Sequence, residues 1–380
     1  MLLLSVKAST TPEKYLSVRI MNISPLQSKR LARVKAASTT RKVNFDTITH
    51  ILTGNLQPQV GDLVLAKVEE IGQHKRIDLA TGRKAHLFVG DEIIVVYGNR
   101  YAPDQFEAEV PLDLSPCHLI AAGGLAGMVV SQHIKIDIPT SITPIGLLAD
   151  NKGQRVNISD WALSPTNYIG QRPFTIAVVG TSMNSGKTTT AANMIRGLVN
   201  SGFRVGAAKI TGTGSGNDTW LMRDAGASPI FDFTDVGFPS TYLIPFKELE
   251  RILTTLLSQV AAAEVDVIVI EIADGLYQEE TSKLVSSPAF RRSVDGILFA
   301  ANSALAATAG VLWLKEFQIP VLAISGVVTM SPLASRETSI ATGLPVLDIE
   351  MLQREAANLI ALSSQPQISL PTSQEKIIVA

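Results

Sequence analysis

The sequence predicts an α/β protein in which a parallel-sheet domain follows a smaller β-rich domain. From Pro173 onward, short apolar stretches alternate with longer stretches of helical periodicity. The short stretches, such as VDVIVIEI, are apolar at nearly every position. Strands buried on both faces are typical of a parallel sheet covered by helices. Before this region, apolar stretches are separated by Gly-Asp and Gly-Arg turns, a pattern that favours short strands.

These patterns set the predicted domain boundaries. We expect an N-terminal arm over residues 1–45, a β-rich domain over 46–162, a phosphate-loop domain over 173–362 and a flexible tail over 363–380. Turn-forming residues in 161–172 predict the connection between the two domains. In the β-rich region, LVLAKVEEI, KAHLFV and EIIVVYG each follow a glycine turn, which indicates a small barrel or sandwich.

The C-terminal region has a regular order of predicted strands and helices. The predicted strands are FTIAVVG, FRVGAAKI, VDVIVIEI, DGILFAA, PVLAISGVV and GLPVLDI. The predicted helices include KTTTAANMIRGLVNSG, which Gly202 closes, and the amphipathic PFKELERILTTLLSQVAAAE.

Composition excludes several classes of protein. The chain has 380 residues and a formal net charge of -1, so no overall charge attracts it to nucleic acid or anionic membrane. Its one cysteine, Cys117, rules out an intramolecular disulfide and a cysteine metal cluster, and its apolar neighbours predict a core residue. No apolar stretch reaches the roughly 18 residues of a membrane span. We therefore expect a cytoplasmic protein without a membrane partner.

Two further segments leave alternatives open. Six basic residues and no acid lie between Lys29 and Lys42, which favours a solvated arm over a nucleic-acid contact. The polar segment Gly98–Gln105 lies between predicted strands and is either a binding loop or a plain hairpin connection. The scattered histidines predict satisfied structural residues; they are His74, His86, His118 and His133.

The segment Gly180–Thr189 predicts a phosphate-binding loop, because it follows a strand and begins a helix. Backbone N–H groups of such a loop, with the positive end of the helix, hold phosphate oxygens. Lys187 is expected to reach the β and γ phosphates, and the Thr188 hydroxyl to bind Mg²⁺. The residues predicted to contact nucleotide are Gly180, Thr181, Asn184, Ser185, Gly186, Lys187, Thr188 and Thr189.

Acidic residues near strand ends complete the predicted site. Glu271 ends a continuous apolar strand, where a carboxylate is costly unless something satisfies it. Ligands bind at this edge of a parallel sheet, so Mg²⁺ or its water is the expected partner, with Asp274 as the alternative ligand. Asp218 is a third acid for the metal or the leaving phosphate, and the polar loop 212–217 before it suits substrate contact.

The motif Gly-Thr-x4-Gly-Lys-Thr resembles the phosphate loop of dethiobiotin synthetase and its relatives in the SIMIBI class of P-loop NTPases. The resemblance implies that Lys209, at the end of the second strand, helps to hold phosphates and substrate, and that Glu271 is the acidic partner of Mg²⁺. The stretch Asp218–Ala227 resembles the NTPase that assists molybdopterin-guanine-dinucleotide synthesis. The resemblance covers roughly residues 173–350.

This chain departs from the synthetase pattern at two places. No asparagine occurs in Gly326–Pro332, where the family has its base-reading residue, so ATP is expected and GTP is not excluded. The glycine-rich turn after the acidic strand is replaced by Ile272–Thr281, so we expect a substrate other than that of biotin synthesis.

The leading hypothesis is an ATP- and Mg²⁺-dependent enzyme of ligase or kinase type. It would phosphorylate, and thereby activate, a small carboxylate-like metabolite, with Lys187, Lys209, Asp218 and Glu271 as catalytic residues and Thr188, Glu271 and Asp218 at the metal. The alternative is a nucleotide-dependent switch, or a chaperone for cofactor or metal insertion, that acts as a homodimer on a protein partner. RNA binding by the β-rich domain is disfavoured, because no dense basic-aromatic pattern occurs there.

Overall fold

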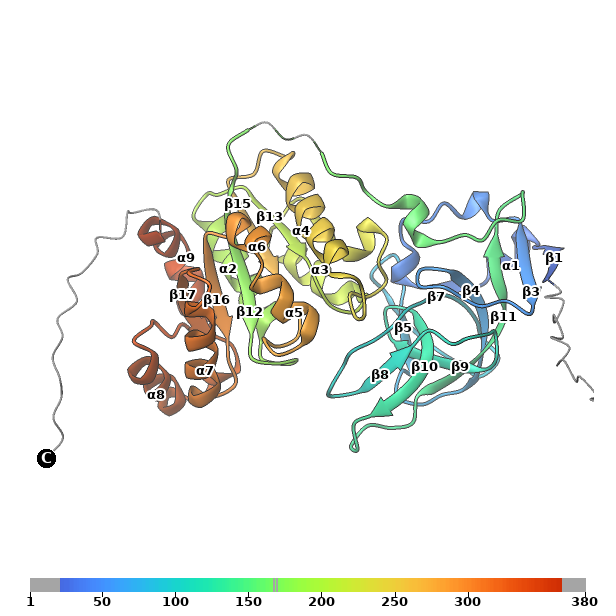
Figure 1. The fold of residues 1–380 in the computed structure, drawn as a ribbon, viewed down its shortest axis with the longest axis horizontal. Helices are drawn as coiled ribbons and strands as arrows, with labels where there is room; N and C mark the ends of the chain where they lie inside the picture. Colours follow the sequence, from blue (N-terminus) through green and yellow to red (C-terminus); the bar gives the residue numbers. More distant parts are fainter. Residues whose placement is uncertain (1–20, 167, 169, 364–380) are drawn as a thin grey trace, which may run out of the picture.

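The first half of the chain forms the predicted β-rich domain, and the second half forms the predicted α/β domain beside it (Figure 1). The computed structural model describes residues 21–166, 168 and 170–363. The first twenty residues of the predicted arm, and the predicted tail apart from its first residue, lie outside this described part.

The β-rich domain is built from short strands joined by tight turns. Its strands are β1 (Met21–Pro25), β2 (Lys35–Ala36), β3 (His50–Gly54), β4 (Leu63–Glu70), β5 (Arg76–Asp78), β6 (Lys84–His86), β7 (Glu92–Tyr97), β8 (Phe106–Glu109), β9 (Cys117–Ala121), β10 (Leu125–Gln132) and β11 (Thr140–Ala149). One short helix, α1 (Ser28–Leu31), follows β1.

Strand pairing closes part of this sheet into a small barrel. β11 pairs with β4, β4 with β7, β7 with β10, and β10 with β9, which pairs back onto β11. Closure removes free edges from these strands, and their inward side chains form an apolar interior. Cys117 lies in this interior and is 1 % exposed, as its apolar neighbours predict.

The α/β domain has a six-stranded sheet in the order β14-β13-β15-β12-β16-β17, and every pair in it is parallel. The strands are β12 (Phe174–Gly180), β13 (Val205–Lys209), β14 (Ile230–Asp232), β15 (Val267–Glu271), β16 (Gly296–Ala300) and β17 (Val321–Ser325). The parallel sheet predicted from continuous apolar strands is thus confirmed.

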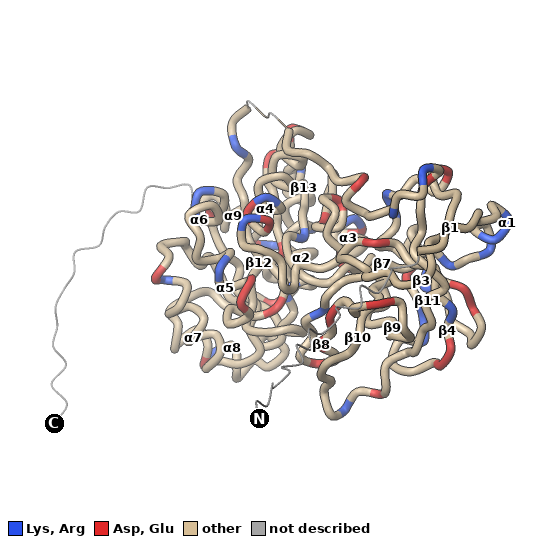
Figure 2. The backbone as a smooth tube through the Cα atoms, turned by 45° about the vertical axis from the view of Figure 1, so that its right-hand side comes forward, with Lys and Arg blue, Asp and Glu red and all other residues tan. Residues whose placement is uncertain are grey.

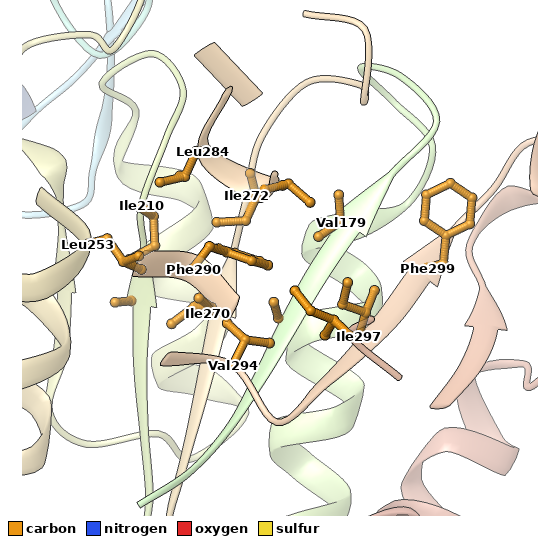
Figure 3. Close-up of a cluster of buried hydrophobic side chains, with 14 of the residues drawn as sticks. Val179, Ile210, Leu253, Ile270, Ile272, Leu284, Phe290, Val294, Ile297 and Phe299 are labelled. Carbon is orange, nitrogen blue, oxygen red and sulfur yellow. The ribbon is translucent and has the colours of Figure 1, made fainter. Parts of the chain in front are cut away.

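Helices cover both faces of this sheet. They are α2 (Lys187–Asn200), α3 (Gly216–Asp224), α4 (Phe246–Ala261), α5 (Glu279–Val285), α6 (Pro288–Ser293), α7 (Ala304–Lys315), α8 (Pro332–Thr342) and α9 (Ile349–Ser363). Helices α4 to α7 pack on one face, around Ile270, Phe290 and Phe299 (Figure 3). Helices α2, α3 and α9 pack on the other face. The central strands are therefore buried on both sides.

One predicted strand is wrong. GLPVLDI forms no strand; only Val346 makes an isolated parallel bridge, to Ile324 at the edge of the sheet. Residues on either side of it belong to α8 and α9, so the segment is a short connection between helices that touches the sheet once.

The basic segment from Lys29 to Lys42 is not a solvated arm. Arg30 pairs with Glu92 at 2.5 Å, and Lys35 pairs with Asp91. The flanking strand β1 pairs along its whole length with β3. The sequence could not reveal these pairs, because the acids come from distant parts of the chain. Figure 2 shows basic and acidic residues interspersed along the backbone of both domains.

Arg41 joins the two domains. Its guanidinium lies 2.9 Å from Asp232 and 2.7 Å from Asp235 in the α/β domain, and both acids are 2 % exposed. Asp232 ends β14 and Asp235 lies in the turn directly after it, at the carboxyl edge of the parallel sheet. Two buried carboxylates this close repel each other unless a cation lies between them, so the junction depends on Arg41.

We predict that Arg41→Ala lowers the free energy of unfolding by about 3 kcal/mol, because it leaves two buried carboxylates without their main cation. The partly exposed pair between Arg30 and Glu92 gives the control, and Arg30→Ala should cost less than about 1 kcal/mol. Chemical denaturation of both variants measures the difference. Equal losses would show that the junction does not depend on Arg41.

Candidate nucleotide-binding site

The carboxyl ends of three neighbouring strands bring the predicted residues together. β12 is followed by the phosphate loop, β13 ends at Lys209, and β15 ends at Glu271. In the sheet, Glu271 lies between Lys209 on one side and Val178 on the other. The parallel register therefore places a cation and an anion next to the start of the loop, where ligands of such sheets bind.

The loop has the backbone shape that phosphate binding requires. Gly186 has φ = 98°, a left-handed conformation, and directly precedes the first turn of α2. A Cβ at Gly186 would lie 2.9 Å from Gly326 Cα, so a larger residue would also collide with the neighbouring loop. Backbone bonds hold the loop at both ends: Thr181 N–H donates to Ala300 O at 3.0 Å, and Val327 N–H donates to Ser185 O at 3.0 Å.

Several polar groups of the loop are buried. Among the described residues, no hydrogen-bond partner is found for the buried hydroxyls of Thr181 and Ser185. Lys187 is 6 % exposed and donates to Ser182 O at 2.7 Å, so its ammonium folds back over the loop. Burial lowers the pKa of Lys187, although Glu271 and Asp274 oppose the shift.

Thr188 and Glu271 form the candidate magnesium position. The Thr188 hydroxyl donates to Glu271 Oε1 at 3.0 Å, and Glu271 Oε2 is buried without a hydrogen-bond partner among the described residues. Mg²⁺ takes oxygen ligands, of which several are usually water and phosphate. Within the described chain, no group of three or more His, Cys, Asp or Glu side chains could hold a metal. These residues fit an ion that phosphate and water also coordinate.

Lys209 is held between two acids. It is 8 % exposed, pairs with Asp218 from α3, and lies 3.8 Å from Glu271 Oε1. Burial alone would lower the pKa of Lys209, but the charges of Asp218 and Glu271 outweigh burial and raise it. Burial raises the pKa of Glu271, and Lys209 partly opposes this. Lys209 thus stays charged and fixed.

Asp274 faces the same space three residues beyond the strand. It has φ = 62°, which is uncommon for a residue other than glycine, and such strained residues cluster at functional sites. Burial raises the pKa of Asp274 to about 6, against the opposing charges of Lys187 and Lys209. An acid with this pKa changes protonation near physiological pH and is suited to proton transfer.

A cavity of about 630 Å³ opens between the two domains at this point. The α/β domain contributes the phosphate loop, Lys209, Glu271, Asp274 and the polar loop before Asp218. The β-rich domain contributes the opposite wall, with Gln73, His74, Arg100, Tyr101 and Gln105. Above the loop, Asn184 Nδ2 donates to Asp104 Oδ2 at 2.7 Å and links the two walls.

The structure gathers most of the predicted residues at one place. Lys187, Thr188, Lys209, Asp218 and Glu271 all line the cavity. So do Asn184, Gly186 and Thr189 from the loop, whereas Gly180, Thr181 and Ser185 are not among the lining residues. Asp218 pairs with Lys209, and its predicted metal contact stays a prediction. The loop 212–217 also reaches the cavity, through Gly212–Ser215.

Sequence reasoning did not assign the wall from the β-rich domain. Arg100, Tyr101 and Gln105 belong to Gly98–Gln105, for which a binding loop was one of two open alternatives. His74, predicted as a satisfied structural residue, lines the cavity, and its buried Nδ1 has no hydrogen-bond partner among the described residues. A polar segment between strands was the only signal, because the facing domain is distant in sequence.

The loop between β12 and α2, the parallel sheet and the acid at the end of β15 define a P-loop NTPase domain of the SIMIBI class. The family model described as molybdopterin guanine dinucleotide synthesis protein B matches residues 175–298. This match covers the loop, Lys209, Glu271 and the stretch Asp218–Ala227, and the predicted class is confirmed.

The chain is also similar to a cobyrinate a,c-diamide synthase from Herminiimonas arsenicoxydans. The two are 32 % identical over 154 residues, which cover 40 % of this chain and 31 % of that protein. The chain therefore spans about a third of the length of the curated relative that it matches.

Similar solved structures include the signal recognition particle 54 kDa protein from Aeropyrum pernix K1 in complex with GDP. It is 17 % identical, with a TM-score of 0.35, over 54 % of this chain and 50 % of that one. The signal recognition particle receptor FtsY from Elizabethkingia anophelis, in complex with GDP, is 15 % identical, with a TM-score of 0.32, over 55 % and 60 %. Among the helices of the described residues, none combines the length and the apolar character of a membrane-spanning segment.

We predict that Gly186→Ala abolishes nucleotide binding, weakening it more than about 100-fold, because the loop must distort around the new Cβ. Gly202 gives a matched control, since it has φ = 90° at the other end of α2 and a Cβ added there would meet no atom within 4 Å. Fluorescence titration with a labelled ATP analogue and Mg²⁺ measures both. Tight binding by Gly186→Ala would contradict the assignment of the loop.

Proposed function

We propose that this protein is an ATP- and Mg²⁺-dependent enzyme that transfers a phosphoryl group to a small carboxylate metabolite and so activates it. The observation that carries the proposal is the shared cavity. The phosphate loop and Lys209 form one wall, and a second domain closes the other. A cavity of about 630 Å³ falls within the range of small-molecule sites.

Each group on the loop side has a role in this reaction. The phosphate loop would hold the β and γ phosphates through backbone N–H groups, and Lys187 would neutralise charge that develops on the transferred group. Thr188 and Glu271 would hold Mg²⁺, which supplies charge neutralisation between the phosphates when bound. Lys209, fixed by Asp218 and Glu271, would orient the acceptor next to the γ phosphate.

Asp274 supplies the proton chemistry. A carboxylate acceptor forms a new P–O bond while the bond to ADP breaks, and it loses no proton. If an amine then attacks the acyl phosphate, it forms a C–N bond, releases phosphate and gives up a proton. Asp274 faces the cavity and, when ionised, would accept that proton. The name of the curated relative, a diamide synthase, fits this sequence of steps, because a diamide is made from carboxyl groups.

The second candidate is a nucleotide-dependent switch that acts as a homodimer on a protein partner. Exposed apolar side chains next to the cavity favour it. Tyr277 is 85 % exposed on the loop after Asp274, and Met330 is 83 % exposed just after Val327, which lines the cavity. In a nucleotide-dependent switch, loops beside the nucleotide change conformation with its state. Exposed apolar side chains on such loops suit a transient contact with a partner protein. GTP in place of ATP is compatible with either candidate.

Turnover decides between the two. We predict that purified protein releases ADP from ATP and Mg²⁺ faster when a pool of small carboxylates and amines is added. Lys187→Ala should lower that rate more than about 100-fold, because it removes charge stabilisation from the transferred group. A coupled ADP assay measures this, and the circular dichroism of the variant confirms its fold. Tight ATP binding without turnover across the pool would favour the switch.

We also predict that, with a carboxylate and an amine as substrates, kcat/KM for the amine falls about tenfold per pH unit below about pH 6, because protonated Asp274 cannot accept the proton that the amine gives up. Asp274→Asn should be slow and should lack this limb of the pH profile. Asparagine tolerates a positive φ, so the change strains the backbone little. The exposed Asp224 provides the control, and Asp224→Asn should keep the wild-type profile. A profile that is unchanged in Asp274→Asn would exclude the acid from proton transfer.

A further inference from the structure

Arg100 is a buried cation that has no ion-pair partner among the described residues. It lies between β7 and β8, is 6 % exposed, and lines the cavity on the wall opposite the phosphate loop. In the described part of the chain, no carboxylate comes within ion-pair distance of it, although thirteen other pairs are formed. A buried charge without a compensating partner costs free energy. The buried Arg100 therefore calls for an anion that a ligand supplies.

The guanidinium is held in place by neutral acceptors. Nη1 donates to the carbonyl of Ile120, and Nη2 donates to Gln105 Oε1 at 2.9 Å. These bonds fix the plane of the group but cancel none of its charge. The Arg100–Gln105 bond also lies within the segment Gly98–Gln105, so the polar loop that the sequence singled out is organised around this cation.

Among the described residues that line this wall, Arg100 carries the only positive charge. Burial and the charge of Arg100 together lower the pKa of His74 to about 3, so His74 is neutral. Burial lowers the pKa of Arg100 to about 10, and the acid that opposes this shift is Asp274, across the cavity. Arg100 therefore remains charged at neutral pH and faces acids of the other domain without touching them.

We propose that Arg100 binds a second acidic group of the acceptor, so that the substrate is a small dicarboxylate held at both ends of the cavity. This inference rests on the proposed function for the end that is phosphorylated. Lys187 and Lys209 serve the phosphates and the reacting carboxylate, while Arg100 binds the distal carboxylate in the fork geometry that guanidinium offers. The β-rich domain is then the substrate-recognition domain.

The test compares matched ligands on the full-length protein, by calorimetry, with Mg²⁺ and a non-hydrolysable ATP analogue present. Succinate, glutarate and adipate are each paired with the monocarboxylate of the same chain length. We expect at least one dicarboxylate to bind the wild-type protein about tenfold or more tighter than its partner, since a charge-assisted bond to Arg100 is made only by the dicarboxylate. Arg100→Gln should erase that difference and leave the affinity for the ATP analogue unchanged.

Two further variants and a melting measurement distinguish a specific effect on binding from misfolding. Arg100→Lys keeps the buried charge but loses the planar fork, so it should retain a smaller preference for the dicarboxylate. Arg76→Gln removes an exposed arginine from the same domain and should change nothing. Thermal melting identifies any variant that is unfolded, and Arg100→Lys replaces Arg100→Gln if the latter is.

Three outcomes would overturn the proposal. The dicarboxylate preference could persist undiminished in both Arg100 variants, no dicarboxylate could bind the wild-type protein better than its partner, or Arg100→Gln could weaken binding of the ATP analogue instead. The last would assign Arg100 to the nucleotide phosphates. Because binding is measured without turnover, a failure here is distinct from a failure of phosphoryl transfer, which the ADP assay reports.

Discussion

One row of charged residues across the parallel sheet determines the geometry of the site. In the strand register, Asp232, Lys209 and Glu271 lie side by side at the carboxyl edge of β14, β13 and β15. All three are buried, so their charges must be balanced locally. Lys209 lies next to an acid on either side, and its pKa is raised although burial alone would lower it. The three charges therefore stabilise one another, and each depends on its neighbour in the row for compensation.

The pairs made by this row reach beyond the sheet. Lys209 binds Asp218, which fixes α3 and the loop before it against the cavity. Glu271 binds Thr188, which fixes the first turn of α2 and hence the phosphate loop. Asp232 binds Arg41, which fixes the barrel. The buried charges at the strand ends must be balanced, and the partners that balance them thus hold both the phosphate loop and the second domain in place.

The sequence was sufficient for the parts of this arrangement that depend on local pattern. Continuous apolar strands predicted the parallel sheet, and Gly186-Lys187-Thr188 between strand and helix predicted the loop. Glu271 was found because a carboxylate at the end of an apolar strand needs a partner. GLPVLDI has the apolar content of a strand but forms only one bridge, since its position between α8 and α9 was not encoded locally.

What the sequence could not predict depends on contacts between distant segments. The acids that pair with Arg41 lie about two hundred residues away, so the basic segment could not be distinguished from a solvated arm. The role of Arg100 could not be predicted for the same reason. Nothing in Gly98–Gln105 shows that this arginine has no acid partner among the described residues and faces a phosphate loop. Both facts require the relative placement of two domains.

The relative placement of the two domains gives the two walls of the cavity different kinds of binding group. On the loop side, backbone N–H groups and a helix end recognise phosphate in any nucleotide, and Lys209 and Asp274 lie beside them. The facing wall adds a second set of side chains, which are held by a barrel with few free edges. Because that wall is buried, each charged contact in it is stronger, and leaving a charge there unpaired costs more free energy. In the proposed reaction, selection among acceptors would involve the β-rich domain, which contributes no residue of the phosphate loop.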